Sequence, residues 1–298
     1  MSVEASLRPR GPYSLALTAR ASSDATRVFR DGVLDAIVPG AAGPERARAW
    51  QTPGGTVHVL AASDEGVDRV RFVLALDDDH SEFLRRFARD RLLREAVWHL
   101  RGLRTIRVPT VAFALLRALC GQLIESSRAR QIERGIVRRT MPRVADGLCA
   151  PPTESALAGQ APAALRALGL HARRGATLVR LCGSLDLERL HAVPTEVAAA
   201  RLGRERGLGP WSVGVICLEG LGRREQGLVG DLGLVKLASA LRGEWVEAAE
   251  TAELLEPYGE WAGLASLYLM AGFARGLVPL PDGSRVRKPP ARIHRRAA

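Results

Sequence analysis

Residues 204–218 read Arg-Glu-Arg-Gly-Leu-Gly-Pro-Trp-Ser-Val-Gly-Val-Ile-Cys-Leu. Gly207 and Gly209 have no Cβ, so the backbone can turn tightly between two helices and a phosphate group can approach the main-chain N–H groups. Pro210 suits the first turn of the following helix, where a missing N–H costs nothing. A glycine turn before a helix also occurs at many ordinary helix junctions, so this motif needs a second signal.

Residues 230–234 supply that signal, since they read Gly-Asp-Leu-Gly-Leu and Asp231 follows Trp211 by twenty residues. The two segments resemble those of the helix-hairpin-helix DNA glycosylase superfamily. Its members carry a hairpin of the form L-P-G-[IV]-G-P-W-[ST]-A and a later segment G-D-L-[GA]-L, whose aspartate is catalytic. The order of elements is similar to that of the 3-methyladenine DNA glycosylase II branch. Arg206 departs from the pattern, because the family has proline there.

The resemblance implies an α+β fold that is mainly α. An N-terminal antiparallel α/β domain is expected over residues 1–79. An all-α helix-hairpin-helix bundle of two subdomains is expected over residues 80–280, with the hairpin at 204–214. The last segment, 281–298, is basic, has no apolar periodicity and is expected to be disordered.

Apolar patterns predict the elements within these domains. Leu15 and Leu17 alternate with small or polar neighbours, and residues 70–76 alternate cleanly, so both segments are predicted to be strands. Turn residues at 30–32 and 53–55 predict two hairpins. From Ser81 to about Gly276 the apolar residues recur at helical spacing. Helix starts are predicted at Thr110, Thr153, Pro162 and Thr195, and stops or turns at Gly147, Gly169, Gly203 and Gly243.

The chain is strongly basic. Its 298 residues carry 43 lysine and arginine residues against 32 aspartate and glutamate residues, a net charge of +11. Attraction to a polyanion is the natural interpretation, and the alternative is an arginine-rich composition that reflects genomic base composition rather than function. The mean hydropathy is −0.01, and neither a long apolar run nor a secretory signal is present. We therefore expect a cytoplasmic, nucleoid-associated monomer that binds double-stranded DNA and no membrane.

Four cysteines, Cys120, Cys149, Cys182 and Cys217, form no C-x-x-C pair. This spacing excludes a zinc ribbon and the closely spaced cysteines that hold an iron–sulfur cluster in one branch of the superfamily. The cysteines are predicted to be reduced core thiols. No metal site or other cofactor is expected. The one candidate is a monovalent cation, which in the family often bridges hairpin carbonyls to a DNA phosphate.

Residues 120–124, Cys-Gly-Gln-Leu-Ile, resemble the family's G-Q-[LQ]-[VI]-S segment. In the alkylpurine branch, the residue after glutamine wedges into the DNA stack where the damaged nucleotide has left. Leu123 holds that place beside Gln122, and an apolar wedge compensates the cost of unstacking. The alternative is that Leu123 is a core leucine on an amphipathic helix.

Cleavage of an N-glycosidic bond passes through a sugar with oxocarbenium character, which a fixed carboxylate beside C1′ stabilises while it activates a water. Asp231 is the candidate carboxylate, and the alternative is a plain helix N-cap. Family members that also cut the backbone have a Schiff-base lysine where this chain has Trp211. Lys236 is interpreted as a phosphate contact or a solvated charge. We therefore expect hydrolysis without lyase activity.

Four residues are candidates for the base pocket. Trp211 can stack on an extruded base, and Trp261 lies in a segment that resembles the family's P-W-R-S-Y. The alternative for Trp261 is an ordinary core residue. Val215 and Leu232 stand where other members have aromatic residues, which leaves the substrate range open.

Contacts with the DNA backbone are expected from the hairpin. The N–H groups of residues 207–211 are expected to hold a phosphate. The named candidates are Gly207, Leu208, Gly209, Trp211, Arg204 and Arg206, with Arg128, Arg173 and Arg174 as further basic residues. The expected function is a monofunctional base-excision-repair glycosylase that flips out an alkylated purine of the 3-methyladenine type and leaves an abasic site. The alternatives are a glycosylase for an oxidised or deaminated base, and a non-catalytic DNA-binding protein.

Overall fold

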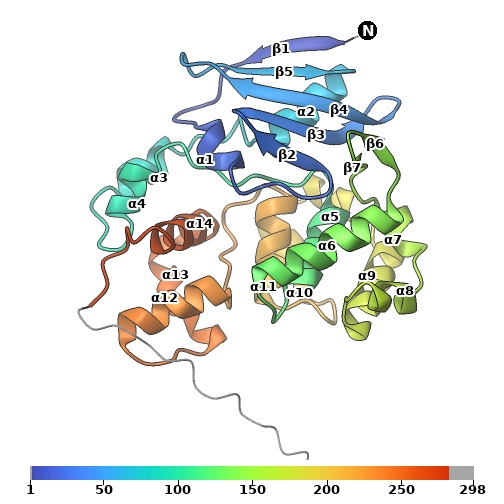
Figure 1. Cartoon of the computed structure of the whole chain (residues 1–298). Coiled ribbons are helices and arrows are strands. Elements are labelled where there is room, and N and C mark those ends of the chain that lie inside the picture. Colours follow the sequence, from blue (N-terminus) through green and yellow to red (C-terminus); the bar gives the residue numbers. More distant parts are fainter. Residues whose placement is uncertain (1, 282–298) are drawn as a thin grey trace, which may run out of the picture.

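The computed structural model describes residues 2–281, so residues 282–298 of the predicted tail lie outside the described residues. The N-terminal part forms a five-stranded antiparallel sheet in the order β1-β5-β4-β3-β2 (Figure 1). Its turns at 30–32 and 53–55 join neighbouring strands, so both predicted hairpins are confirmed. The strands are β1 (Val3–Leu7), β2 (Arg27–Arg30), β3 (Val33–Gly40), β4 (Gly43–Gln51) and β5 (Val57–Ala61).

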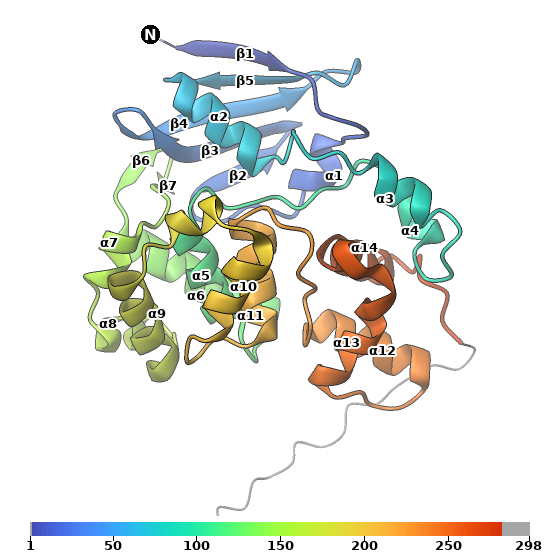
Figure 2. The ribbon, with the colours of Figure 1, turned by 180° about the vertical axis from the view of Figure 1, so that it is seen from behind.

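Two segments predicted to be strands are helices, α1 (Leu15–Ala19) and α2 (Asp64–Val73). The Ser63 hydroxyl caps α2 by accepting a hydrogen bond from the Gly66 N–H at 3.1 Å. Val67, Val70 and Val73 recur every three residues and are buried, which is the spacing of one helix face. Figure 2 shows α2 lying across one face of the sheet. The alternation at 70–76 does not mark a strand, because its first residues form the last turn of α2 and the following residues lie beyond the end of the helix at Val73.

The rest of the described chain is helical except for a small hairpin, β6 (Arg143–Ala145) and β7 (Leu148–Cys149), so the all-α prediction is wrong there. Caps at Thr110 and Thr153 and the N1 proline at Pro162 are confirmed. The helices are α3 (Ser81–Arg86), α4 (Arg94–His99), α5 (Val111–Gly121), α6 (Ser126–Thr140), α7 (Glu154–Ala158), α8 (Pro162–Ala167), α9 (Ala172–Ser184), α10 (Thr195–Gly203), α11 (Pro210–Val215), α12 (Leu232–Arg242), α13 (Thr251–Leu255) and α14 (Ala262–Phe273).

Two hydrophobic cores hold these parts together, one beneath the sheet and one among the helices. A buried ion cluster joins the parts. Arg117 on α5 donates to Asp24 beside the sheet at 2.9 Å, to Glu133 on α6 at 3.0 Å, and to Glu219 at 2.9 Å. Removing one partner from such a cluster leaves an uncompensated buried charge. Within residues 2–281, no helix has both the length and the apolar character needed to cross a membrane.

Candidate active site

The glycine-rich hairpin connects α10 to α11. Gly207 has φ of +100°, and a Cβ added there would lie 2.7 Å from the Thr177 hydroxyl oxygen, so only glycine fits. Gly209 has φ of −101°, and apart from its two chain neighbours no described residue has an atom within 4 Å of where its Cβ would be. Nothing inside the protein therefore requires glycine at 209, and the open backbone there is free for an external group.

The hairpin presents its polar backbone to solvent. Leu208 is buried, whereas Gly207, Gly209, Arg204 and Arg206 are exposed. From α9, the Arg180 side chain braces the turn by donating to the Glu205 carboxylate at 2.7 Å and to the Arg206 carbonyl at 2.9 Å. The exposed arginines lie beside the first turn of α11, whose N–H groups have no helical acceptor. This arrangement suits an anion.

Asp231 is the N-cap of α12. Its Oδ1 accepts a hydrogen bond from the Gly233 N–H at 2.7 Å, and its Oδ2 accepts one from the Trp211 indole Nε1–H at 2.9 Å. The preceding Gly230 has φ of +87°, and its N–H donates to the Thr251 hydroxyl at 2.7 Å. The half-buried carboxylate is thus oriented from α11, from α12 and by its own loop.

Gln122 and Leu123 follow the last turn of α5. The Gln122 side-chain amide donates to the Gly207 carbonyl and to the Ser212 hydroxyl, each at 2.9 Å. Leu123 has φ of +56° and its side chain is 98% exposed. The core interpretation of Leu123 is therefore wrong, and the side chain projects into solvent next to a residue that is bonded to the hairpin.

Trp211 brings the three segments together. A Cβ added to Gly121 would lie 2.4 Å from Cη2 of Trp211, so the indole packs on the end of α5 while its N–H reaches Asp231. Gly121 and Thr251 belong to this site although the sequence did not single them out. The signal for Gly121 was its place directly before Gln122 in the motif. Thr251 had no comparable signal, because its partner is twenty-one residues away.

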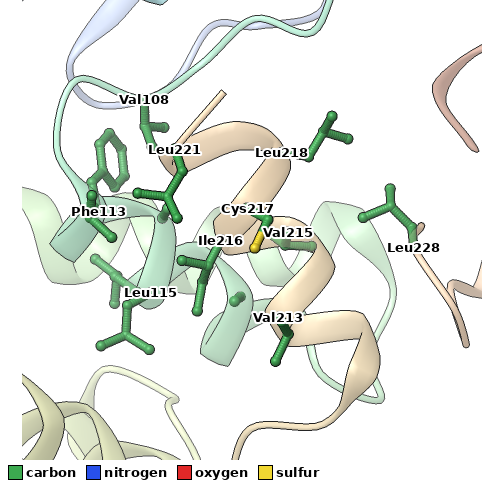
Figure 3. Close-up of a cluster of buried hydrophobic side chains, with 14 of the residues drawn as sticks. Val108, Phe113, Leu115, Val213, Val215, Ile216, Cys217, Leu218, Leu221 and Leu228 are labelled. Atoms are coloured by element: carbon green, nitrogen blue, oxygen red, sulfur yellow. The ribbon is translucent and has the colours of Figure 1, made fainter. Parts of the chain in front are cut away.

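Two predicted pocket residues are buried in the helical core. Val215 is 4% exposed and belongs to the apolar cluster between α5 and α11 that Figure 3 shows. Trp261 is 2% exposed, with the Arg224 guanidinium 3.9 Å from its ring centroid and Phe83 against it. Neither side chain offers surface on which a base could stack. Helix periodicity explains Val215, which falls on the face of α11 that packs inward.

Leu232 is 39% exposed and directly follows Asp231, so it stays at the site together with half-buried Trp211. Among the other basic candidates, Arg128, Arg173 and Lys236 are exposed. Arg174 is half-buried, and burial lowers the pKa of its guanidinium. Among the described residues, none of these four side chains forms a hydrogen bond or an ion pair with Asp231.

The cysteines play no part in this site. All four are free and buried, as predicted. Burial raises the pKa of the Cys182 and Cys217 thiols to about 12, so they stay protonated and unreactive near neutral pH. Within residues 2–281, no group of three or more histidine, cysteine, aspartate or glutamate side chains could hold a metal ion.

Comparison with known proteins identifies the fold. No family model and no curated protein matches the sequence. The structure is similar to a 3-methyladenine DNA glycosylase from Archaeoglobus fulgidus, with a TM-score of 0.79 and 21% identity over 92% of this chain and 98% of that one. It is also similar to the 8-oxoguanine glycosylase/lyase of Clostridium acetobutylicum in complex with double-stranded DNA, with a TM-score of 0.73 and 18% identity over 93% and 98% of the two chains. The chain has the fold of the helix-hairpin-helix DNA glycosylases.

Proposed function

We propose that this protein is a monofunctional DNA glycosylase that extrudes an alkylated purine of the 3-methyladenine type from double-stranded DNA and hydrolyses its glycosidic bond. The observation that carries the proposal is the hydrogen bond from Trp211 to Asp231 beside the exposed Leu123. A carboxylate, an aromatic ring and an apolar wedge from distant parts of the chain meet at one place, as extrusion and cleavage of a nucleotide require.

The extruded base is proposed to enter between the helices α5–α11 and the helices α12–α14. Trp211 belongs to the first group, and Asp231 opens the second. Leu123 fills the gap that the nucleotide leaves in the stack. The hairpin N–H groups and Arg204 and Arg206 hold the phosphates on one side of that gap.

Asp231 is proposed to act on the sugar. With Oδ1 held by the Gly233 N–H and Oδ2 by the Trp211 indole, the carboxylate keeps a fixed negative charge where the oxocarbenium ion develops. Each oxygen has a second lone pair, which can take a proton from the attacking water. An N3- or N7-alkylated purine leaves as a neutral base, so no strong general acid is needed.

The lack of lyase chemistry is proposed from the side chains at the site. Schiff-base formation needs an amine that can reach C1′. The position implied for that lysine is Trp211, whose indole nitrogen already donates to Asp231. Lys236 is exposed on α12, and Lys288, the other lysine of the chain, lies outside the described residues. Borohydride trapping of the enzyme on damaged duplex should therefore yield no covalent complex.

The small number of aromatic residues at the site favours a second class of substrate. With Val215 and Trp261 buried, Trp211 is the aromatic residue left among the predicted pocket positions, and a cationic base is attracted most by several aromatic faces. An oxidised or deaminated base, read by hydrogen bonds rather than by stacking, is the runner-up substrate.

The test is base release from methylated duplex DNA, with 3-methyladenine and 7-methylguanine resolved, by the wild type and by Asp231→Asn. Asparagine can still cap α12, so the variant should fold and bind duplex while losing at least roughly 100-fold in rate. A duplex with 8-oxoguanine is the matched substrate control. Release of 8-oxoguanine alone would establish the runner-up. Binding without any release would move the search to deaminated bases first and to a non-catalytic protein second.

A further inference from the structure

Trp98 is, after Leu123, the most exposed large apolar side chain of residues 2–281, at 75% exposed. The proposed duplex site explains Leu123 but not Trp98, which lies on α4. No aromatic pair or cation–π contact among the described residues includes its indole. An indole this exposed is available for contact with a ligand, and what it contacts depends on the charged residues around it.

Two exposed arginines lie near Trp98 along the chain, one on α4 and one just beyond its end. Ala96 and Val97 are buried, and a Cβ added to Gly272 of α14 would lie 3.0 Å from the Ala96 Cβ, so that face of α4 packs tightly on α14. Arg94 precedes Trp98 by four residues and Arg101 follows it by three, and both are exposed. The i,i+4 spacing puts Arg94 and Trp98 on one face of α4, and Arg101 follows two residues after the helix ends at His99. We call the surface of Trp98, Arg94 and Arg101 the Trp98 face.

The chain segment that carries the Trp98 face is rich in arginine, and one of its arginines, Arg86, lies 3.8 Å from the Glu260 carboxylate. Between residues 85 and 101 the two acidic residues are engaged: Asp90 accepts from backbone N–H groups at 2.9 Å, and Glu95 lies 3.3 Å from Arg94. The C-terminal residues 282–298 hold six lysine and arginine residues and one aspartate, so their charge does not complement this surface. The exposed arginines of the segment are Arg85, Arg86, Arg89, Arg91, Arg94 and Arg101.

The Trp98 face is separate from the duplex site. In both views α3 and α4 lie on the far side of α14 from α5 and α6, whose junction carries Leu123 (Figures 1 and 2). The Trp98 face and the α5–α6 junction therefore belong to different parts of the fold, on opposite sides of α14.

We propose that the Trp98 face binds single-stranded DNA, with an unpaired base stacked on the indole and neighbouring phosphates paired with Arg94 and Arg101. An aromatic platform among guanidinium groups is the chemistry that binds single strands without sequence preference, because every base has a π face and every nucleotide a phosphate. Duplex DNA keeps its bases stacked and cannot use the indole in this way. The proposal is independent of which base the enzyme releases.

The test is fluorescence anisotropy of labelled (dT)20 with the full-length protein. Trp98→Ala should weaken binding roughly 5- to 100-fold, the usual loss for one stacked base, with an unchanged melting temperature because the side chain is exposed. Trp98→Phe should stay within about threefold of the wild type, since phenylalanine also stacks. Arg94→Gln with Arg101→Gln should lower the slope of log K against log salt by about 1.4, for two contacts to a single strand.

The matched control is Arg166→Gln with Arg189→Gln, which removes two exposed arginines of α8 and of residues 188–192, and it should leave (dT)20 binding unchanged. An equal loss in the control and in the Arg94 and Arg101 variant would overturn the proposal, because general charge would then explain binding. Wild-type affinity in Trp98→Ala would also overturn it, and would make a protein with an acidic and apolar surface the occupant.

Discussion

Trp211→Phe is the sharpest perturbation that the site offers. The indole Nε1–H donates to Asp231 Oδ2 at 2.9 Å, and the far edge of the ring packs on Gly121. Phenylalanine keeps an aromatic ring on the same Cβ but has no N–H and does not reach as far. The variant therefore separates two roles of Trp211, since stacking on a base survives the change and orientation of the carboxylate does not.

The expected effect follows from the strength of that hydrogen bond. A hydrogen bond to a charged group contributes about 1.5–3 kcal/mol, and each 1.36 kcal/mol in the barrier is tenfold in rate. If the bond holds Asp231 in its reactive orientation, Trp211→Phe should lower the single-turnover rate by roughly 10- to 100-fold. Duplex affinity should change little, because the hairpin backbone and Leu123 are untouched.

The assay is single-turnover base release at saturating enzyme, together with duplex affinity and melting temperature. Trp50→Phe is a matched control, since Trp50 is a half-buried tryptophan of the sheet that stacks on His58. The same change is then made in Asp231→Asn, where it should cost nothing further, because the charge that Trp211 orients is gone. A wild-type rate in Trp211→Phe would refute the positioning role, as would an equal loss in both backgrounds.

Three further perturbations test the hairpin, the wedge and the buried ion cluster. Gly207→Ala should lower the melting temperature, because φ is +100° and Thr177 leaves no room for a Cβ. Gly209→Ala should melt at the wild-type temperature and weaken duplex binding roughly tenfold, which corresponds to about 1.4 kcal/mol. Equal melting temperatures of the two variants would contradict this. Leu123→Gly should be as stable as the wild type or more so, since glycine suits its positive φ, yet release paired lesions more slowly, and an unchanged rate would remove the wedge. Burial opposes ionisation of Asp24, but Arg27 and Arg117 hold the pKa of its carboxyl below the usual range. The stability it contributes is therefore complete above its unfolded pKa of about 3.9 and is lost as the pH falls below that value. Asp24→Asn should be less stable than the wild type in urea unfolding at pH 7, and the gap should narrow near pH 3.

The turns of the fold are predictable from the sequence, but a short apolar pattern can fit either a strand or a helix. The turns at 30–32 and 53–55 were predictable, because turn chemistry is local. The apolar residues of 70–76 fit both the two-residue period of a strand and the spacing of a helix face. The helix forms because it buries Val67, Val70 and Val73. The Ser63 cap, followed by Asp64 and Glu65 in the first turn, was the signal that could have corrected the strand prediction.

At the site, the sequence motifs identify which segments come together, but they do not predict which side chains are exposed. The motif positions of Trp211, Gln122 and Asp231 do converge, through hydrogen bonds that no spacing rule contains. The same motifs also suggested Trp261 and Val215, which are buried. A motif match fixes the place of a residue along a helix, but which face is covered depends on the neighbouring helices, and those contacts are long-range.

The two interpretations of Asp231 are not exclusive. Oδ1 caps α12 through the Gly233 N–H, while Oδ2 takes the Trp211 N–H, so the cap itself holds the carboxylate in one orientation. Asp231→Asn keeps an acceptor for the cap and removes the charge, whereas Asp231→Ala removes both. If the residue only caps, Asn should be near wild type and Ala should be destabilised by about 1 kcal/mol. If it also catalyses, both variants should lose base release, and only Ala should lose stability as well.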